Sequence, residues 1–398
     1  MAEPAQHADV AIVGAGVVGA AVAHYLTATG ACAAGSILLI ERDPAFQTGA
    51  TGRSAGGVRL QFSTPENIAM SRVMLDLLRD LAATFGAGAD VSFRPHGYLL
   101  LASAEGRAVL AANHAAQSRA GAGIALLEAA ALAQRFPWLA GDGLAAGCHG
   151  IGIEGWLDPA SLAQLFRRSA LARGARMIVG DVTGMPLANA RAIASLELGD
   201  GRRIVARHVV NAAGPWAGAL ARMAGVVLPV EPRKRFVYVL DCRDADAALH
   251  QAPLTVDPSG VWFRPEGQRF LAGRSPEPDR EPAIGDLDAV DHDFFETDIW
   301  PVLAARVPAF GAVRVANAWA GYYDYNTFDQ NAVIGRHPRI ANLYFANGFS
   351  GHGLQQAAAA GRAIAELIVH GRFTTLDLTR LGFERIEHGE RLAERNVI

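Results

Sequence analysis

The chain has 398 residues, of which 51% are hydrophobic, and a formal net charge of -3. This length and composition allow a large buried core and two domains, and the lack of a basic block excludes the electrostatic footprint of a nucleic-acid-binding protein. We therefore expect a small-molecule partner. Three cysteines without CxxC spacing, Cys32, Cys148 and Cys242, predict no metal site and no disulfide framework, which favours a reducing compartment. Since no export signal or membrane span is evident, we expect a cytoplasmic protein, at most peripheral to the inner face of a membrane.

The first apolar segment leads into a glycine-rich turn, in DVAIVGAGVVGAAVAHYLTATG (residues 9–30). A predicted strand over Val10 to Val13 enters Gly14-x-Gly16-x-x-Gly19 and then a helix that ends at Gly30. This order is typical of a turn that approaches a pyrophosphate closely. The motif alone is a weak signal, because the chain contains 43 glycines.

A second apolar strand in SILLIERD, residues 36–43, strengthens this interpretation because it ends at Glu41. A carboxylate at this distance accepts hydrogen bonds from a ribose diol, and it disfavours the 2′-phosphate of NADP. The two segments together predict a site for an adenine dinucleotide, either NAD or FAD. The alternative is a βαβ unit whose glycines serve only its own packing.

The chain then departs from the regular repeat of a nicotinamide-binding domain. A small-residue loop, AFQTGATGRSAGGVRLQFSTPENI (residues 45–68), precedes a helix that we expect Thr64 to cap and Pro65 to begin. Further along, Asp158 is expected to cap another helix at Pro159. A buried strand then enters NAAGPW, so the αβ pattern resumes after an interruption. We expect a discontinuous nucleotide-binding domain.

The interrupting segments predict a second domain. They contain strands such as KRFVYVLD and VWFRPEGQRFLAG between turns rich in proline and glycine, a pattern typical of antiparallel sheet. Residues 275–291 are expected to form a surface loop, and the charged end of the chain an exposed tail. The expected fold is α/β, with a Rossmann-like cofactor domain over 1–90, 151–225 and 322–385, a mainly antiparallel α+β substrate domain over 91–150 and 226–321, and a tail over 386–398.

Near the other end of the chain, NGFSGHGLQQAAAAGRAIAEL (residues 347–367) places glycines, a serine and a histidine before an alanine-rich helix. Without Cβ atoms, the backbone N–H groups of Gly351 and Gly353 can approach a ligand closely. The helix predicted from Leu354 directs its positive end the same way, so the turn suits an electron-rich group.

Six stretches now carry a resemblance to a known family. GAGVVG, LLIERD, TGRSAGG, NAAGPW, DQNAVIG and GFSGHG, in this order, resemble the D-amino-acid oxidase superfamily of flavoproteins, which includes sarcosine oxidase, glycine oxidase and D-amino-acid dehydrogenases. GRSAGGVRLQFSTPENI and WAGYYDYNTFDQNAVIG are similar to the branch of mitochondrial FAD-dependent oxidoreductase domain proteins associated with complex I assembly, and to bacterial relatives of that branch. The resemblance implies FAD rather than NAD as the cofactor.

The resemblance also assigns residues to the cofactor. The GFSGHG turn would stabilise the negative charge that develops on the flavin when it is reduced. For His352 the alternative is a turn histidine without a chemical role, and for Trp216 it is core packing. The assigned cofactor residues are Gly14, Gly16, Val17, Val18, Gly19, Glu41, Arg42, Thr51, Arg53, Ser54, Ala55, Gly56, Gly57, Val182, Ala213, Gly214, Trp216, Gly348, Ser350, Gly351, His352, Gly353 and Leu354.

The family's reaction removes a hydride from the carbon that bears an amine, and the resulting imine hydrolyses. The amine must be neutral at that step, so we expect an acceptor such as Tyr322 or Tyr323, with His352 as an acid–base candidate. An amino-acid carboxylate would need a cation, and the alternative role for each candidate arginine is an ordinary salt bridge. The assigned substrate-binding residues are Arg59, Phe62, Arg235, Trp262, Arg264 and Gln355, with core filling as the alternative for Trp262.

Departures from the family pattern modify these expectations. Tyr322 stands where sarcosine oxidases attach FAD through a cysteine, so FAD should be bound non-covalently. Leu271 stands near the position of the lysine that serves oxygen, and Lys234 is the only lysine of the chain. We therefore expect electrons to pass to a quinone or another carrier rather than to oxygen. Gln355 and Phe62 replace two carboxylate-binding residues of sarcosine oxidases, which disfavours sarcosine itself as substrate.

Two functions of different class stay open at this stage. The first is an FAD-dependent dehydrogenase or oxidase of an amino acid or an N-substituted amine. The second is a flavin-containing assembly or scaffold protein with little or no turnover. The sequence leaves the oligomeric state open.

Overall fold

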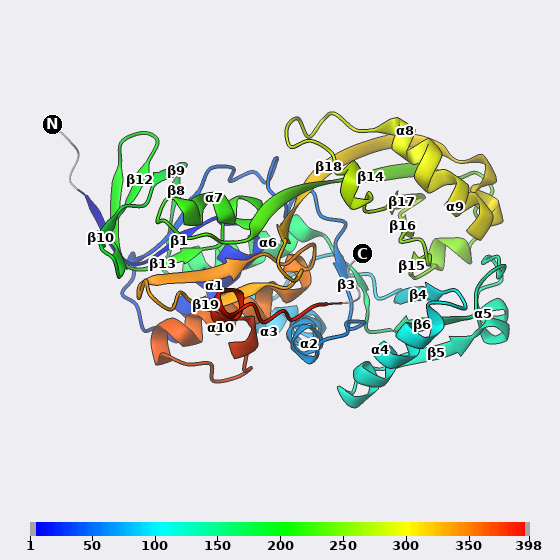
Figure 1. Ribbon diagram of the computed structural model, residues 1–398, viewed down its shortest axis with the longest axis horizontal. Coiled ribbons are helices and arrows are strands. Elements are labelled where there is room, and N and C mark those ends of the chain that lie inside the picture. Colours follow the sequence, from blue (N-terminus) through cyan, green and yellow to red (C-terminus); the bar gives the residue numbers. More distant parts are fainter. Residues whose placement is uncertain (1–4, 151, 395–398) are drawn as a thin grey trace.

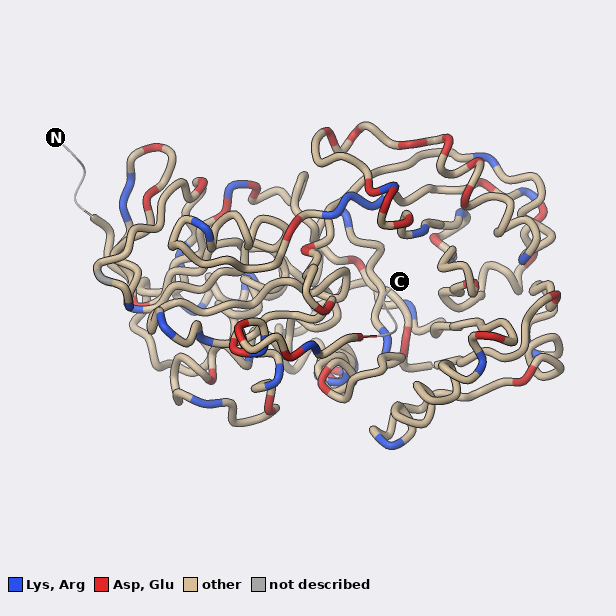
Figure 2. The backbone as a smooth tube through the Cα atoms, in the orientation of Figure 1, with Lys and Arg blue, Asp and Glu red and all other residues tan. Residues whose placement is uncertain are grey.

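The computed structural model describes residues 5–150 and 152–394. Two bodies lie side by side, each built on an eight-stranded sheet, and the long strands β14 (Val230–Asp241) and β18 (Arg314–Asn326) run from one body into the other (Figure 1). Acidic and basic residues are interspersed along the chain in both bodies (Figure 2). Among the described residues, no helix is long and apolar enough to cross a membrane.

The first sheet contains both apolar strands of the predicted nucleotide-binding unit. Strand β1 lies at its centre and pairs in parallel with two neighbours, as expected for βαβ connections. In spatial order the strands are β19 (Val333–Arg336), β20 (Leu343–Asn347), β13 (Arg203–Asn211), β1 (Gln6–Val13), β2 (Ile37–Glu41) and β8 (Arg176–Val179), with β12 (Leu196–Leu198) and β9 (Val182–Gly184) attached through β13.

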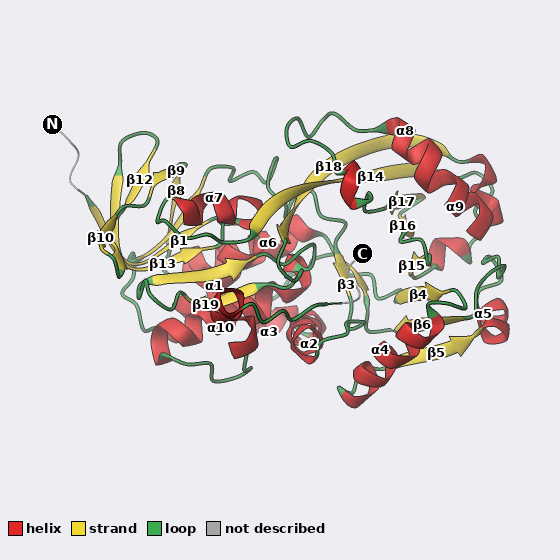
Figure 3. Ribbon diagram, viewed as in Figure 1, coloured by secondary structure: helices red, strands yellow, loops and turns green. Residues whose placement is uncertain are grey.

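Alternating residues of β1 bury two different cores. Val10 and Ile12 pack with the helices α1 (Val17–Thr29) and α10 (Gly353–His370), whereas Ala11 and Val13 face the opposite core. The period of two in side-chain direction explains why the whole strand is apolar. Figure 3 shows helices packed along this sheet.

The helix ends test the predicted caps. Gly30 ends α1 with a φ of 66°, and the side chain of Asp158 accepts from the N–H of Ser161, so both predictions are confirmed. The predicted start of α2 is confirmed, with Thr64 at the N-cap position and Pro65 as the first helical residue, but the Thr64 side chain forms no capping hydrogen bond. Its hydroxyl instead donates to Oε2 of Glu394, 330 residues further along the chain.

The second sheet is antiparallel except where β15 pairs with β4. One of its faces packs against helices, with Phe236, Tyr238 and Phe270 in that core. In spatial order its strands are β18, β14, β17 (Arg269–Gly273), β16 (Trp262–Glu266), β15 (Leu254–Val256), β4 (Tyr98–Ala102), β6 (Ala146–Gly150) and β5 (Ile124–Glu128).

The remaining elements cover the two sheets and connect them. The helices are α2 (Pro65–Arg79), α3 (Leu81–Phe85), α4 (Arg107–Arg119), α5 (Ala129–Arg135), α6 (Pro159–Ala172), α7 (Ala217–Arg222), α8 (His292–Phe294), α9 (Trp300–Arg306) and α11 (Glu384–His388). Two short strand pairs complete the structure, β3 (Gly57–Val58) with β7 (Gly155–Trp156) and β10 (Leu187–Asn189) with β11 (Ala192–Ile193).

The end of the chain differs from the expected exposed tail. Glu394 is only 4% exposed, and its carboxylate accepts hydrogen bonds from the backbone and hydroxyl groups of Ser63 and Thr64 and from the side chain of Asn67. Its charge is placed at the start of α2, where the helix dipole favours an anion. Residues 395–398 of the predicted tail lie outside the described residues.

Candidate active site

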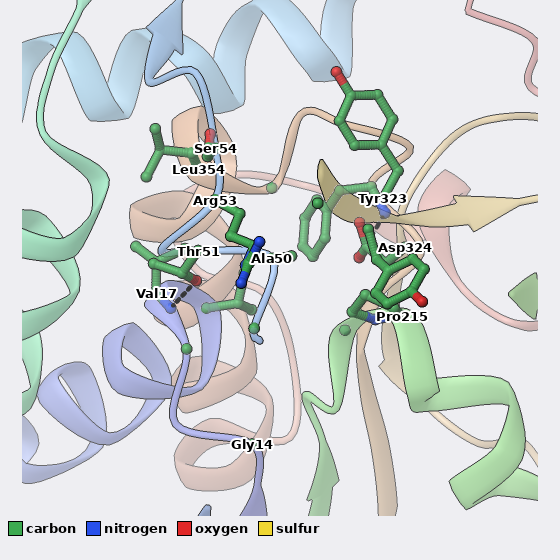
Figure 4. A pocket seen from close by; sticks show the side chains of 18 of the residues that line it. Gly14, Val17, Ala50, Thr51, Arg53, Ser54, Pro215, Tyr323, Asp324 and Leu354 are labelled. Atoms are coloured by element: carbon green, nitrogen blue, oxygen red, sulfur yellow. Dashed lines mark hydrogen bonds between the residues drawn. The ribbon is translucent and has the colours of Figure 1, made fainter. Parts of the chain in front are cut away.

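A cavity of about 360 Å³ joins the two bodies. Its lining includes the first glycine turn, the loop over residues 42–59, residues 235–237 in the middle of β14, residues 321–324 near the end of β18, and the start of α10. In Figure 4 the turn at Gly14 lies at one end of this cavity, while Tyr323 and Asp324 lie at the other. The two glycine-lined turns that the sequence places near opposite ends of the chain therefore border one space.

The three positions in the first turn hold glycine, but not for the same physical reason. A Cβ on Gly14 would lie 2.3 Å from the carbonyl oxygen of Ala212, and one on Gly19 would lie 1.9 Å from the carbonyl oxygen of Gly14. These two positions permit close packing of backbone on backbone. Gly16 lines the cavity, and there a side chain would approach the hydroxyl of Thr51. The turn thus leaves a space beside Gly16 that a side chain at that position would occupy.

Glu41 lies at the end of β2 and borders the same part of the cavity. Its carboxylate accepts from the N–H of Ala15 at 2.6 Å and from the N–H of Asp43 at 2.8 Å. The N–H of Val17 donates to the hydroxyl of Thr51 at 3.0 Å. A carboxylate held this way can still accept from ribose hydroxyls, so this end fits the adenosine half of a dinucleotide.

The loop over residues 42–59 crosses the cavity as a chain of small residues. A Cβ on Gly56 would lie 2.2 Å from the carbonyl oxygen of Leu157, which shows how tightly the loop is packed from behind. Arg53 is held by the carbonyl oxygens of Gln47 and Ala320. The guanidinium of Arg264 donates to the carbonyl oxygen of Ala55, at 3.1 and 3.0 Å.

The second turn shows a division of roles within GFSGHG. Gly351 has a φ of 95°, and a Cβ there would lie 2.6 Å from the ring of Tyr323. Ser350 has a φ of 52° and is buried, with its hydroxyl accepting from the N–H of Asn326. Gly348 and Ser350 therefore shape the turn, while residues 351–354 face the cavity at the N-terminus of α10.

His352 forms a buried pair with Arg59. Their side-chain nitrogens, Nε2 and Nη2, are 3.1 Å apart, and because a guanidinium only donates, Nε2 of the histidine accepts. Burial, and then the positive charge of Arg59, lower the pKa of His352 well below its usual value. The imidazole is therefore neutral and positions Arg59, an arrangement that argues against an acid–base role. The edge of the Phe62 ring packs on the same imidazole.

Arg235 is already paired within the protein. Its guanidinium donates to both carboxylate oxygens of Glu281, at 2.7 and 2.8 Å, and lies over the ring of Tyr323. Glu281 belongs to the expected surface loop over residues 275–291, which thus reaches the cavity wall. Arg235 could bind a substrate carboxylate only after Glu281 is displaced.

The two candidate tyrosines differ in availability. The hydroxyl of Tyr322 accepts from the N–H of Gly285 and donates to its carbonyl oxygen, so its hydrogen bonds are directed at the loop over residues 275–291. This geometry argues against Tyr322 as the acceptor for an amine. Tyr323 lines the cavity, and burial raises the pKa of its hydroxyl, so it is protonated at neutral pH.

The remaining predicted residues divide between the cavity and its surroundings. Trp262, Trp216 and Gln355 line it, and Gln355 accepts from the N–H of Arg59. None of the three cysteines lines it, and Lys234 is held by two backbone carbonyls of the loop over residues 275–291. The predicted site residues that lie outside the lining are Gly19, Phe62, Arg264, Gly348 and Ser350.

Sequence reasoning missed several lining residues, of which Asp324 is chemically the most important. It is 8% exposed, and its Oδ2 accepts from the N–H of Phe349. Burial raises its pKa to about 6. Its position within YYDYN, two residues after Tyr322 on a strand, was the available signal. Tyr98 also lines the cavity, against the loop at Gly57.

The sequence of this chain is similar to those of known flavoproteins, in agreement with the geometry of the cavity. Residues 9–367 match the family model of DAO, the FAD-dependent oxidoreductases. An FAD-dependent oxidoreductase domain-containing protein 1 from Xenopus laevis is 41% identical over 99% of this chain and 86% of its own length. A mitochondrial sarcosine dehydrogenase from Mus musculus is 26% identical over 98% of this chain and 43% of its own length.

A similar fold occurs among solved structures. The L-proline dehydrogenase of P. horikoshii superposes with a TM-score of 0.84 at 25% identity, covering 98% of this chain and 100% of that one. The family model, the sequence relatives and the fold agree with a cavity that fits a dinucleotide at one end and a charged small molecule at the other. The chain belongs to the DAO family and is an FAD-dependent oxidoreductase.

Proposed function

We propose that this protein oxidises the C–N bond of an amino acid or an N-substituted amine and passes the electrons to a quinone or another carrier. The observation that carries the proposal is the single cavity, which has glycine turns for the cofactor and, next to them, Arg59, Arg235 and Tyr323. The names of relatives support the same class, since sarcosine dehydrogenase, glycine oxidase and L-proline dehydrogenase are among them.

The residues present fit FAD at both ends of the cavity. Gly16, Val17 and Glu41 would hold the pyrophosphate and adenosine half, and the backbone at Gly351 and Gly353 would face the flavin. When bound, FAD supplies the acceptor for the hydride that leaves the carbon next to nitrogen. The positive end of α10 suits the negative charge that the reduced cofactor carries.

The protein's own contribution is to bind the substrate and to keep its amine neutral. At the substrate end the lining includes buried charged side chains, among them Arg59, Arg235 and Asp324, and exclusion of water there disfavours an unpaired ammonium. Aromatic side chains of Trp262 and Tyr323 offer apolar surface for the substrate's carbon atoms. Arg59, which His352 and Gln355 position, supplies positive charge near the second turn.

A carrier rather than oxygen is proposed as acceptor because the cavity has no lysine. Leu271 is buried in a small apolar cluster with Val237 and Val239, and the only lysine of the chain, Lys234, is held outside the lining. The reduced protein should therefore be reoxidised slowly by oxygen and rapidly by a soluble quinone. Comparable rates with both acceptors would contradict this part of the proposal.

The reaction is tested by mixing the purified yellow protein anaerobically with a panel of amino acids and secondary amines. Loss of flavin absorbance with any of them, followed by recovery on adding quinone, is the expected result. Denaturation should release FAD into solution, because no cysteine lines the cavity. If no compound of the panel bleaches the flavin, the assembly or scaffold function replaces the enzymatic one.

A further inference from the structure

Asp324 is a buried carboxylate that faces the cavity from the end of β18. It is 8% exposed and lines the cavity. Its side chain accepts from the N–H of Phe349 at 3.1 Å, and its carbonyl oxygen accepts from the N–H of Ser350 at 3.0 Å. These contacts fix the carboxylate beside the second glycine turn.

Three arginines that line the cavity have partners other than Asp324. Arg235 is bound to Glu281, and Arg274, which also lines the cavity, is bound to Glu277 and Asp298. Arg59 donates to His352. Among the described residues, Asp324 forms no salt bridge with any arginine, lysine or histidine.

A buried carboxylate without a cationic partner has a strong electrostatic preference for a cationic ligand. Moving such a charge out of water is costly, and a bound ammonium offsets that cost through a charge-assisted hydrogen bond. A substrate amine arrives mainly protonated at neutral pH and must lose that proton before hydride can leave. Asp324 is therefore suited to both tasks, binding the cation and receiving its proton.

We propose that Asp324 binds the ammonium group of the substrate and takes up its proton, so that the site selects amines over molecules whose only charge is a carboxylate. This inference rests on the proposed amine oxidation. The N–H bond breaks and an O–H bond forms on Asp324, which leaves a lone pair on nitrogen. When bound, FAD would supply the acceptor for the hydride of the adjacent carbon, and the lone pair that Asp324 has freed on nitrogen would complete the C=N bond.

The binding step can be tested without turnover by three molecules of similar shape. tert-Butylammonium has no hydrogen on the carbon next to nitrogen, so it cannot be oxidised; tert-butanol is neutral and pivalate is anionic. Titration of the holoprotein with each, followed through the flavin absorbance, measures affinity directly. We expect tert-butylammonium to bind at least about tenfold more tightly than pivalate, because one charged hydrogen bond is worth that much.

Substitution then assigns the preference to one carboxylate. Asp324→Asn keeps an oxygen for the N–H of Phe349 but removes the charge, and it should weaken tert-butylammonium binding about tenfold while leaving tert-butanol unchanged. Asp324→Glu should restore part of the preference. Asp288→Asn is the matched control, since the Asp288 side chain is 90% exposed beside Arg53. Retained FAD content in each variant shows that the fold survives.

The pH dependence supplies a second readout. Protonation of Asp324 removes its charge, so tert-butylammonium should bind more weakly as the pH falls through about 6. The facing His352 and Tyr323 keep their protonation states in this range, because burial lowers the pKa of the imidazole and raises that of the phenol. Arg59 and Arg235 line the same cavity. Asp324→Asn should abolish the dependence.

The outcomes separate this inference from the proposed function. Cation binding that Asp324→Asn does not change, or tighter binding of pivalate by the wild type, overturns the role of Asp324 even if amines are oxidised. Suppose instead that Asp324 selects cations but no amino acid or secondary amine bleaches the flavin. The binding role of Asp324 would then be supported, whereas its proton-transfer role and the proposed amine oxidation would both be contradicted.

Discussion

The cofactor half of the cavity and its substrate half are built from different material. Around Gly14 and Gly351 the walls are backbone, and the decisive feature is the lack of a Cβ. Around Asp324 the walls are charged side chains from β14, β18 and two loops, most of them already paired. The first kind of wall depends mainly on which residues of a short turn lack a side chain, whereas the second depends on how charged side chains from distant segments meet.

The sharpest test of the backbone half is Gly14→Ala. The φ of this residue is 98°, and the new Cβ would lie 2.3 Å from the carbonyl oxygen of Ala212, so we expect a loss of about 4 kcal/mol in unfolding free energy and of bound FAD. Urea unfolding and flavin content measure both. Gly30→Ala is the control, with a φ of 66° and nothing within 4 Å, and should cost only about 1 kcal/mol. Equal losses would show that packing at the turn is unimportant.

Glu394 tests the dependence on distant segments at a contact outside the cavity lining. Glu394→Gln removes a charge that Ser63, Thr64 and Asn67 solvate at the start of α2, so we expect roughly 2 to 3 kcal/mol of destabilisation. Chemical unfolding measures it. Glu390→Gln is an exposed control in the same segment and should change stability by less than about 0.5 kcal/mol. An unchanged midpoint for Glu394→Gln would mean that the end of the chain is only loosely attached.

Glu154 lies fully buried behind the loop that carries Arg59, accepting from the N–H of Leu60 and from Gln61. Burial raises its pKa to about 7. The folded protein therefore holds this proton more tightly than the unfolded chain, so stability falls as the pH rises from about 5 to 7, by about 2 kcal/mol.

The measurement is the difference between wild type and Glu154→Gln in urea unfolding at several pH values. The variant should lack this component, while the exposed control Glu128→Gln should keep it. Parallel pH curves for wild type and Glu154→Gln would contradict a buried, proton-binding Glu154.

Glu281→Gln tests the ion pair between Arg235 and Glu281, and its effect on ligand affinity is the smallest expected here. Removing the carboxylate frees the guanidinium of Arg235, so pivalate should bind about five- to tenfold more tightly, as followed by flavin absorbance. Glu231→Gln removes the partner of Arg233 on the same strand and should leave pivalate binding unchanged. If both variants behave alike, Glu281 does not mask the site.

The predictions from sequence succeeded where adjacent residues determine the geometry. The strand before Gly14, the end of the second strand at Glu41 and the cap at Asp158 are set by local spacing and, for Asp158, by a local hydrogen bond. Thr64 occupies the predicted N-cap position, but its hydroxyl does not cap the helix because it donates to the carboxylate of Glu394, from the other end of the chain. Asp324 was overlooked because its environment is produced by Phe349, on a separate segment.

By itself the sequence determined a site for an adenine dinucleotide, since the absence of side chains at a turn and the placement of one carboxylate are properties of short segments. The choice of FAD over NAD came from the resemblance to a family, which the family match bears out. Only the tertiary structure decided which charges are available to a substrate. Arg235 lies on a strand that the sequence predicts, and Asp324 on one that it did not predict. Arg235 is neutralised by Glu281, whereas Asp324 forms no ion pair among the described residues. That distinction depends on the packing of a loop and a turn against β14 and β18, because electrostatic energy depends on distances through space and on burial, which spacing along the chain does not specify.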